Sequence, residues 1–238
     1  MKGAELAAKY AFPPNRHGYC GKSTFQKALS SYLAGKTRIE PLEDELKKFK
    51  AHYRYLSLIA KENNKKPFDL EVVRAFWTGN GLLDRISQEA LGRFVEHDLF
   101  GSKQKKRAKT LADNLPKGIL AQHSFNSLYI NFVTGRAERS MENFDSCCIT
   151  FGRVLSVSKR SAIILRHAIG WKDGLLVLKP KRQRVALEIR GVRFIDKLSP
   201  GDTVSVHWGM AIEKLGPKEL RALKHYTKKN LDALNNRS

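Results

Sequence analysis

The chain has 238 residues and a hydrophobic content of 42%, which is enough for a packed core and excludes a wholly disordered protein. Its 44 lysines and arginines outweigh its 23 aspartates and glutamates, and the net charge of +21 favours polyanionic partners such as nucleic acid, an anionic membrane face or an acidic protein. No apolar run approaches the roughly 18 residues of a membrane-spanning helix. The three cysteines, two of them adjacent, do not make a disulfide framework, so we expect a cytoplasmic location.

The N-terminal segment combines a short helix with an unusual loop. Residues 4–10 favour a helix, which we expect to end at Pro13 and Pro14 because proline cannot continue the helical hydrogen bonds. The loop that follows, rich in Pro and Gly, contains His17 and Cys20, two possible metal ligands. This loop is either a buried turn with an inert cysteine or a segment that lies close to Cys147.

Four more helices are expected at 23–34, 41–63, 69–78 and 82–99, where apolar residues recur at helical spacing. Pro41 suits the first turn of the second of these helices, and Asp69 is a suitable cap for the third. Their apolar stripes predict a core rather than a cofactor pocket. We therefore expect a helical domain over residues 1–140 and a second domain over 145–238.

Two basic runs are candidate contacts for polyanions, and a solvated surface is the alternative for both. The first precedes or begins a helix, and the second lies between two apolar strands of the second domain, at the expected tip of a hairpin. The candidate residues are Lys103, Lys105, Lys106, Arg107, Lys109, Lys181, Arg182 and Arg184.

Residues 115–146 connect the two halves. A turn is expected at Leu115–Gly118, and residues 123–133 look extended or β-like because they are rich in aromatic and branched side chains. Thr134-Gly135-Arg136 is expected to end this extended segment, and a polar connector then leads to Cys147. His123 is either a structural histidine or a third metal ligand from outside the second domain.

The second domain has the pattern of a small β-barrel followed by a helix. Short apolar runs at 161–165, 174–178 and 185–189 are separated by Gly, Pro and Asp, which is typical of a small closed barrel of the OB-like kind. A helix is expected from about 217 to 234. The fold class predicted is therefore α+β, with a mainly helical domain, a small barrel and a C-terminal helix.

Two motifs in this domain resemble the HypC/HupF family, the small metallochaperones of nickel–iron hydrogenase maturation. Cys147 stands five positions before Gly152, which Arg153-Val154 follow, and the second motif reads Val206-His207-Trp208-Gly209-Met210-Ala211. The resemblance implies a protein that carries an iron centre with cyanide and carbonyl ligands, and that meets maturation proteins or the precursor of the hydrogenase large subunit. It also implies that Cys147 and His207 are the functional positions.

These observations lead to three hypotheses. The first is a metallochaperone or scaffold, not an enzyme, that holds or transfers an iron or nickel centre. Its candidate ligands are Cys147, His207, Cys148, Cys20 and His123, since thiolate and imidazole are strong ligands for such metals. The second is a basic OB-like protein that binds nucleic acid or a ribonucleoprotein. The third is an enzyme that uses the Cys147 thiolate, with its pKa lowered by Arg136, Arg139 or Arg153.

Overall fold

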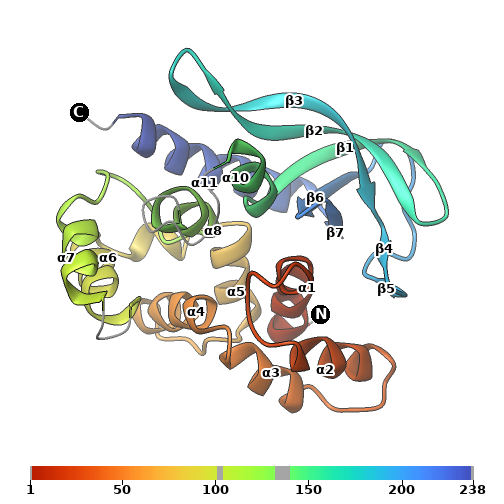
Figure 1. Cartoon of the computed structure of the whole chain (residues 1–238), viewed down its shortest axis with the longest axis horizontal. Coiled ribbons are helices and arrows are strands. Elements are labelled where there is room, and N and C mark those ends of the chain that lie inside the picture. The colour runs from red at the N-terminus through yellow and green to blue at the C-terminus, as the bar shows by residue number, and fades with distance from the viewer. Residues whose placement is uncertain (1, 101–103, 132–139, 237–238) are drawn as a thin grey trace.

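The structure is a computed structural model, and it describes residues 2–100, 104–131 and 140–236 (Figure 1). A helical N-terminal half is followed by a mixed sheet of five strands and a C-terminal helix, so the predicted α+β class is confirmed. In Figure 1 the sheet lies above the first helices, and the C-terminal helix runs beneath its long hairpin. Within the described residues, no helix is both long enough and apolar enough to cross a membrane.

The helices of the first half largely follow the apolar periodicity. The predictions for 23–34 and 69–78 are confirmed by α2 and α5, whereas 41–63 is two helices, α3 and α4, that meet at Lys48 and Phe49. The predicted helix at 82–99 is interrupted at Ile86, whose backbone is extended, before Ser87 caps α6 through its hydroxyl. The bounds are α1 Gly3–Arg16, α2 Thr24–Leu33, α3 Glu40–Lys47, α4 Lys50–Glu62, α5 Leu70–Trp77, the 3₁₀ helix η1 Leu83–Arg85, α6 Gln88–Arg93, the π-helix η2 Phe94–Asp98 and α7 Lys105–Asp113.

The expected end of the first helix is wrong, because α1 continues through Pro13 and Pro14 to Arg16. Each proline lacks an N–H, so the carbonyl four residues earlier, on Lys9 or Tyr10, receives no helical hydrogen bond from it. The helix is buried on nearly all sides, and packing rather than intrinsic propensity holds such helices together. The carbonyl of Tyr10 instead accepts a hydrogen bond from the ring of His207, at the end of the sheet.

The prediction of an extended segment at 123–133 is also wrong. The described part is helical: α8 (His123–Phe125) passes directly into the π-helical turn η4 (Asn126–Ile130). Buried aromatic and branched side chains suit an enclosed helix as well as a strand, so composition alone did not separate the two. The predicted break at Thr134-Gly135-Arg136 lies outside the described residues. Part of the predicted connector is the helix α10 (Met141–Cys147), which Ser140 caps.

The strands pair in the order β1-β2-β3-β7-β6, and β6 pairs with β1 again. The β3–β7 contact is a single parallel pair, Ala186 with Met210. The turn between β6 and β7 consists of Trp208 and Gly209, both with positive φ, which suits a two-residue hairpin. The bounds are β1 Thr150–Val157, β2 Ser161–Lys172, β3 Leu175–Ala186, β4 Glu188–Ile189, β5 Val192–Arg193, β6 Thr203–His207 and β7 Met210–Lys214.

The expected apolar runs at 161–165 and 174–178 lie in β2 and at the start of β3, but the run at 185–189 is divided between the end of β3 and β4. The predicted last helix is confirmed by α11 (Pro217–Asn235). Asn235 bonds both the N–H and the carbonyl of Leu176, so this helix covers the start of the β3 edge.

The two halves share a continuous core. The large apolar cluster of the helices includes Ile149 just before β1, Phe151 in β1, and Met210 and Ile212 on β7. A buried salt bridge between Asp145 of α10 and Arg166 of β2 adds a polar connection, and Asp145 also accepts a 2.8 Å hydrogen bond from the Ile169 N–H. These contacts fix the end of α10 against the sheet, and that end carries Cys147.

Candidate metal centre

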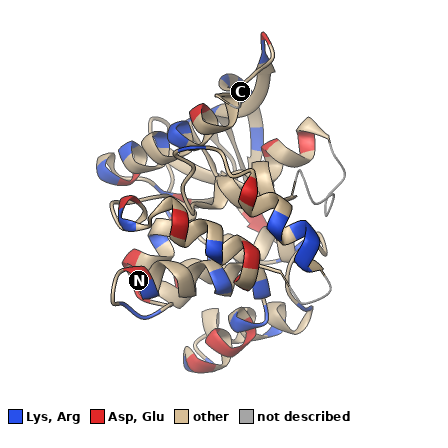
Figure 2. Ribbon diagram, turned by 90° about the vertical axis from the view of Figure 1, so that its left-hand side faces the viewer, with Lys and Arg blue, Asp and Glu red and all other residues tan. Residues whose placement is uncertain are grey.

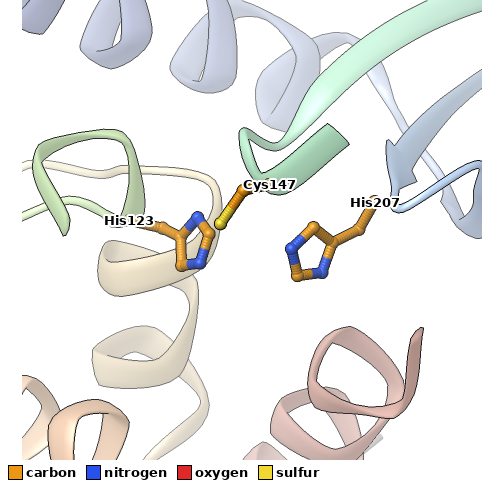
Figure 3. Close-up of side chains that lie close together, drawn as sticks. All are labelled: His123, Cys147 and His207. Atoms are coloured by element: carbon orange, nitrogen blue, oxygen red, sulfur yellow. The ribbon is translucent and has the colours of Figure 1, made fainter. Parts of the chain in front are cut away.

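Three side chains with metal-ligating atoms meet at the seam between the helices and the sheet (Figure 3). His123 comes from α8, Cys147 from the end of α10 and His207 from the end of β6. One ligand atom of each lies within 4.8 Å of the other two. Figure 3 shows the sulfur and the two imidazole rings directed toward a common space. We call these residues the Cys–His–His cluster.

His207 is held in an orientation suited to metal binding. Its Nδ1 lies 2.7 Å from the carbonyl oxygen of Tyr10, the carbonyl that Pro14 leaves without a helical partner. A carbonyl only accepts, so Nδ1 carries the proton and Nε2 presents its lone pair. Nε2 is buried and has no hydrogen-bond partner among the described residues. A ring nitrogen bonded to a backbone carbonyl, with the other nitrogen free, is the usual arrangement of a metal-binding histidine.

His123 is fixed by a stacked ring and a hydroxyl. The indole of Trp77 stacks on its imidazole with ring centroids 4.7 Å apart, and Ser127 Oγ lies 3.2 Å from its Nδ1. Ser127 stands one turn later in η4, and it also lies 3.3 Å from the sulfur of Cys147. The π-helical turn therefore brings one hydroxyl into contact with two members of the cluster, and such turns are frequent at functional sites.

Cys147 is positioned by the last turn of α10. The N–H of Trp208 donates a 2.9 Å hydrogen bond to the carbonyl of Ser146, which ties the β6–β7 turn to this helix end. Burial raises the pKa of the Cys147 thiol, while Ser127, Asn131 and Trp208 partly offset the shift. A bound cation would favour the thiolate, since a coordinating thiol is deprotonated.

The protonation states fit a metal site. Burial lowers the pKa of His207 to about 4, although backbone groups of Tyr10 and Cys147 partly oppose the shift, and burial lowers the pKa of His123 well below its ordinary value. Both imidazoles are therefore neutral at pH 7, as metal ligands must be. In a tetrahedral site with bonds of 2.0–2.3 Å, ligand atoms lie about 3.3–3.8 Å apart. Atoms within 4.8 Å need to approach by only about 1 Å to enclose an ion.

Cys147 lines a cavity of about 230 Å³. The loop after α1 forms one wall, where Asn15 bonds the carbonyls of Cys20 and Lys22 and Tyr19 stacks on Trp208 at 4.5 Å. Gly21 lies directly over the Phe49 ring, where a Cβ would meet ring carbons at 2.3 Å. The remaining lining residues include His52, Asn126, Asn131, Asn143 and Phe144. Cys147 is thus the member of the cluster that lines this cavity.

Two predicted ligands lie outside the cluster. Cys20 is exposed and lines the same cavity as Cys147, so the loop does reach the site, although Cys20 is not one of the three converging residues. Cys148 is buried among Leu128, Phe144 and Ile169 and packs in the core instead. Neighbouring residues at a helix end point in different directions, which separates the two adjacent thiols.

The predicted polyanion contacts fall on two separate elements. Lys105, Lys106, Arg107 and Lys109 lie on α7, and Lys103 is outside the described residues. The expected hairpin tip for the second run is wrong, because Lys181, Arg182 and Arg184 lie within the continuous strand β3 and the β2–β3 turn falls at Asp173 and Gly174. Figure 1 places α7 and the β2–β3 hairpin at different ends of the molecule, and Figure 2 shows basic and acidic segments interspersed on the face it presents. Arg136 and Arg139 also lie outside the described residues, and Arg153 is exposed on β1.

Several contributors to the site were not found from the sequence. Ser127, Trp77, Trp208 and the Tyr10 carbonyl act through contacts that the fold creates. The one signal available for them was Pro14, since a proline in a helix releases the carbonyl four residues before it.

Comparison with known families identifies the chain without giving it an activity. The family model described as "Family of unknown function (DUF6390)" matches residues 1–238, so the chain belongs to this family. No curated protein and no solved structure matches it. The full-length match corrects the expected resemblance to the HypC/HupF family. The motif around His207 has a local explanation, because Trp208 and Gly209 form the hairpin turn between two strands.

Proposed function

We propose that this member of the family binds a first-row transition metal ion through His123, Cys147 and His207. The observation that carries the proposal is the convergence of three ligand atoms within 4.8 Å, from elements far apart in the sequence. The unpartnered Nε2 of His207 supports it, since a buried acceptor without a partner costs about 1–3 kcal/mol and a metal bond would use it.

The ligand set limits the choice of metal. One thiolate and two imidazoles suit Fe²⁺, Co²⁺, Ni²⁺ or Zn²⁺, whereas Mg²⁺ and Ca²⁺ prefer oxygen. Structural zinc sites are usually closed by four protein ligands, whereas a three-ligand site keeps a position open. The cavity beside Cys147 gives access to that position, so we propose a site that holds an exchangeable metal ion rather than a structural one.

Titration of the metal-free protein with Co²⁺ tests this proposal. We expect one equivalent to bind, with a sulfur-to-cobalt charge-transfer band, and competition with Fe²⁺, Ni²⁺ and Zn²⁺ then ranks the metals. Cys147→Ser should remove the band and weaken binding by more than the roughly 10- to 100-fold typical of losing an outer partner. The matched control is Cys148→Ala, which should leave both unchanged. An intact charge-transfer band in Cys147→Ser would contradict the proposal.

The outer face of the sheet supports a second candidate function, polyanion binding on an OB-like scaffold. The closed order of strand pairing resembles that of a small barrel. Arg182 and Arg184 are exposed and pair across the ladder with Leu165 and Ile163, which gives a face of mixed basic and apolar character. Such a face suits a single-stranded nucleic acid, whose backbone is anionic and whose bases are apolar.

Charge changes at two separate sites distinguish this second function from attraction by the overall charge of the protein. We expect a single-stranded oligonucleotide to bind with an affinity that falls steeply with salt. Replacing Arg182 and Arg184 by Glu should reduce the slope of log affinity against log salt by at least about 1.4, about 0.7 for each lost phosphate contact on a single strand, whereas the same change at Lys105 and Lys106 should not. Equal effects of the two double variants would assign the binding to overall charge and remove this candidate.

A further inference from the structure

The β2–β3 hairpin ends in an exposed turn at the outer edge of the molecule (Figure 1). Its two strands pair along their full length. The turn consists of Asp173 and Gly174, both with positive φ, which is the two-residue geometry that Asp-Gly favours. Asn235 of α11 holds Leu176, and the five residues before it, 171–175, are all exposed. We call residues 171–175 the hairpin tip.

The hairpin tip carries two large apolar side chains on opposite faces. Trp171 and Leu175 are 48% and 46% exposed. Trp171 pairs with Leu176 and Leu175 pairs with Lys172, so the indole and the Leu175 side chain project from opposite sides of the ribbon. A protein that packs on one side of the ribbon would leave the other side exposed, whereas a lipid layer entered end-on covers both. Tryptophan is also enriched at membrane–water interfaces.

Lysines accompany these apolar side chains. Lys172 belongs to the hairpin tip, and the ammonium of Lys179 donates a hydrogen bond to the carbonyl of Trp171. Gly170 leaves room for this contact, since a Cβ there would meet the Lys179 stem at 3.3 Å. Lysine stems can lie along apolar surroundings while the charged end stays at the headgroup level. Each cation close to an anionic bilayer strengthens binding about fivefold.

Asp173 is the one acidic residue of the hairpin tip, and the turn explains its presence. Its φ of 51° lies in the left-handed region, which Asn and Asp adopt more readily than most side chains. An anionic surface would repel its carboxylate. Asn suits the same position without the charge, so Asp173→Asn separates the shape of the turn from its electrostatics.

The length of the hairpin suits a shallow insertion. Lys179 follows Leu175 by four residues, which corresponds to about 13 Å along the strand. Interfacial segments bury their apolar groups about 5–10 Å deep. The apolar side chains of the tip can therefore enter the bilayer while the backbone of Lys179 stays outside it. The net charge of +21 adds a long-range attraction to an anionic surface.

We infer that the hairpin tip docks the protein on the surface of an anionic lipid bilayer, with Trp171 and Leu175 inserted and Lys172 and Lys179 at the lipid headgroups. The inference does not rest on the proposed metal site, because the hairpin tip and the Cys–His–His cluster share no residue. It also concerns a different part of the hairpin from the oligonucleotide face, whose arginines lie further along β3.

Co-sedimentation of the full chain with vesicles tests the inference. We expect binding to phosphatidylcholine vesicles that contain about 30% phosphatidylserine, and binding at least about tenfold weaker to phosphatidylcholine alone. Trp171→Ala and Leu175→Ala should each weaken binding to the anionic vesicles about tenfold, and Lys179→Ala about fivefold. Asp173→Asn should strengthen it. The matched control is Leu165→Ala, a 42% exposed leucine elsewhere on β2, which should change binding less than about twofold.

Insertion itself is read from tryptophan fluorescence. Lipids brominated on their acyl chains should quench part of the emission of the bound protein, and Trp171→Phe should abolish that quenching. Quenching that persists in Trp171→Phe would overturn the insertion of the tip.

Three further results would overturn the inference. The first is no binding to anionic vesicles, or equal binding to both kinds of vesicle. The second is an equal loss in Leu165→Ala and in Leu175→Ala, which would assign the binding to exposed apolar surface in general. The third comes from a single-stranded oligonucleotide, whose binding Trp171→Ala should leave unchanged. Equal losses of oligonucleotide and vesicle binding in that variant would assign the hairpin tip to nucleic acid instead.

Discussion

Two buried polar clusters lie on the seam between the helices and the sheet, and they differ in how completely their atoms are paired. In the first, which we call the Glu213 cluster, the Glu213 carboxylate accepts two hydrogen bonds from Arg74 at 3.1 and 3.2 Å and one from Tyr10 at 2.7 Å. In the Cys–His–His cluster, His207 Nε2 has no partner among the described residues. Tyr10 serves both clusters, through its hydroxyl in one and its carbonyl in the other.

This difference separates a structural role from a binding role. A fully paired buried cluster holds the two halves in register, and losing one member leaves the others unpaired. A cluster with an unpartnered lone pair gains little stability from its polar atoms, and that lone pair remains available to a ligand. We therefore expect changes in the Glu213 cluster to act on folding, and changes in the Cys–His–His cluster to act on metal binding.

The largest expected effect on stability comes from replacing Glu213. Glu213→Ala leaves the partly buried Arg74 guanidinium without its carboxylate, so the free energy of unfolding in urea should fall by about 3–5 kcal/mol. In the metal-free protein, His207→Phe removes the unpartnered Nε2 but also the hydrogen bond from Nδ1 to the Tyr10 carbonyl, so it should cost about 1–3 kcal/mol, less than Glu213→Ala. A larger loss in His207→Phe than in Glu213→Ala would contradict the distinction between the clusters.

The second effect is a loss of folding stability at acid pH. It comes from His52, a buried histidine whose ring nitrogens have no hydrogen-bond partner among the described residues. Burial lowers the pKa of His52 from 6.5 to about 3. As the pH falls through 6.5, the unfolded chain binds a proton there and the folded chain does not, so stability is lost until the pH reaches about 3. Between pH 7 and pH 5 this costs the folded state about 2 kcal/mol, at 1.36 kcal/mol per unit.

His52→Phe removes this acid-dependent loss of stability. Phe suits the position because the rings of Phe76 and Trp77 lie next to it. We expect urea unfolding of the metal-free variant at pH 7 and pH 5 to show about 2 kcal/mol less acid destabilisation than the unsubstituted protein. His225→Phe is the control, since His225 is exposed on α11. The same acid loss in His52→Phe and in the unsubstituted protein would show that the buried ring does not resist protonation.

Much of the fold could be predicted because the spacing of apolar residues and the positions of Pro and Gly determine local structure. The helices at 23–34, 69–78 and 217–234 show their apolar stripes directly. The segment at 123–131 could not be assigned this way, because a helix buried on most sides and a strand require the same side chains. The interruptions of the longer helices at Phe49 and Ile86 depend on packing between elements, which a single stripe does not record.

The candidate site could be predicted as a set of residue types but not as an arrangement. His123, Cys147 and His207 stand out as possible ligands, yet so do Cys20 and Cys148, and only the fold separates the three that converge from the two that do not. The error over the family had a similar cause. A cysteine, a glycine and a Val-His-Trp-Gly turn are short features that hairpins of unrelated proteins also require.

The smallest expected effect concerns α1, which contributes Tyr10 to both clusters. It tests whether the Tyr10 carbonyl orients His207 for metal binding. Pro14 denies the Tyr10 carbonyl its helical N–H, and His207 Nδ1 donates to that carbonyl instead at 2.7 Å. Pro14→Ala restores a competing N–H, which should loosen the imidazole and weaken Co²⁺ binding by up to about tenfold, the lower end of the range for outer partners. The free energy of unfolding should not fall through hydrogen bonding, since the helix gains a bond.

Pro13→Ala is the matched control for this experiment. It restores an N–H to the carbonyl of Lys9, one residue away from the acceptor that His207 uses, and removes a similarly buried ring from the same helix. Both variants should therefore change stability alike, while only Pro14→Ala weakens Co²⁺ binding. If both weaken it equally, the prolines act through the shape of α1. If neither does, the Tyr10 carbonyl holds His207 against the competing donor, and the binding cluster is as firmly built as the structural one beside it.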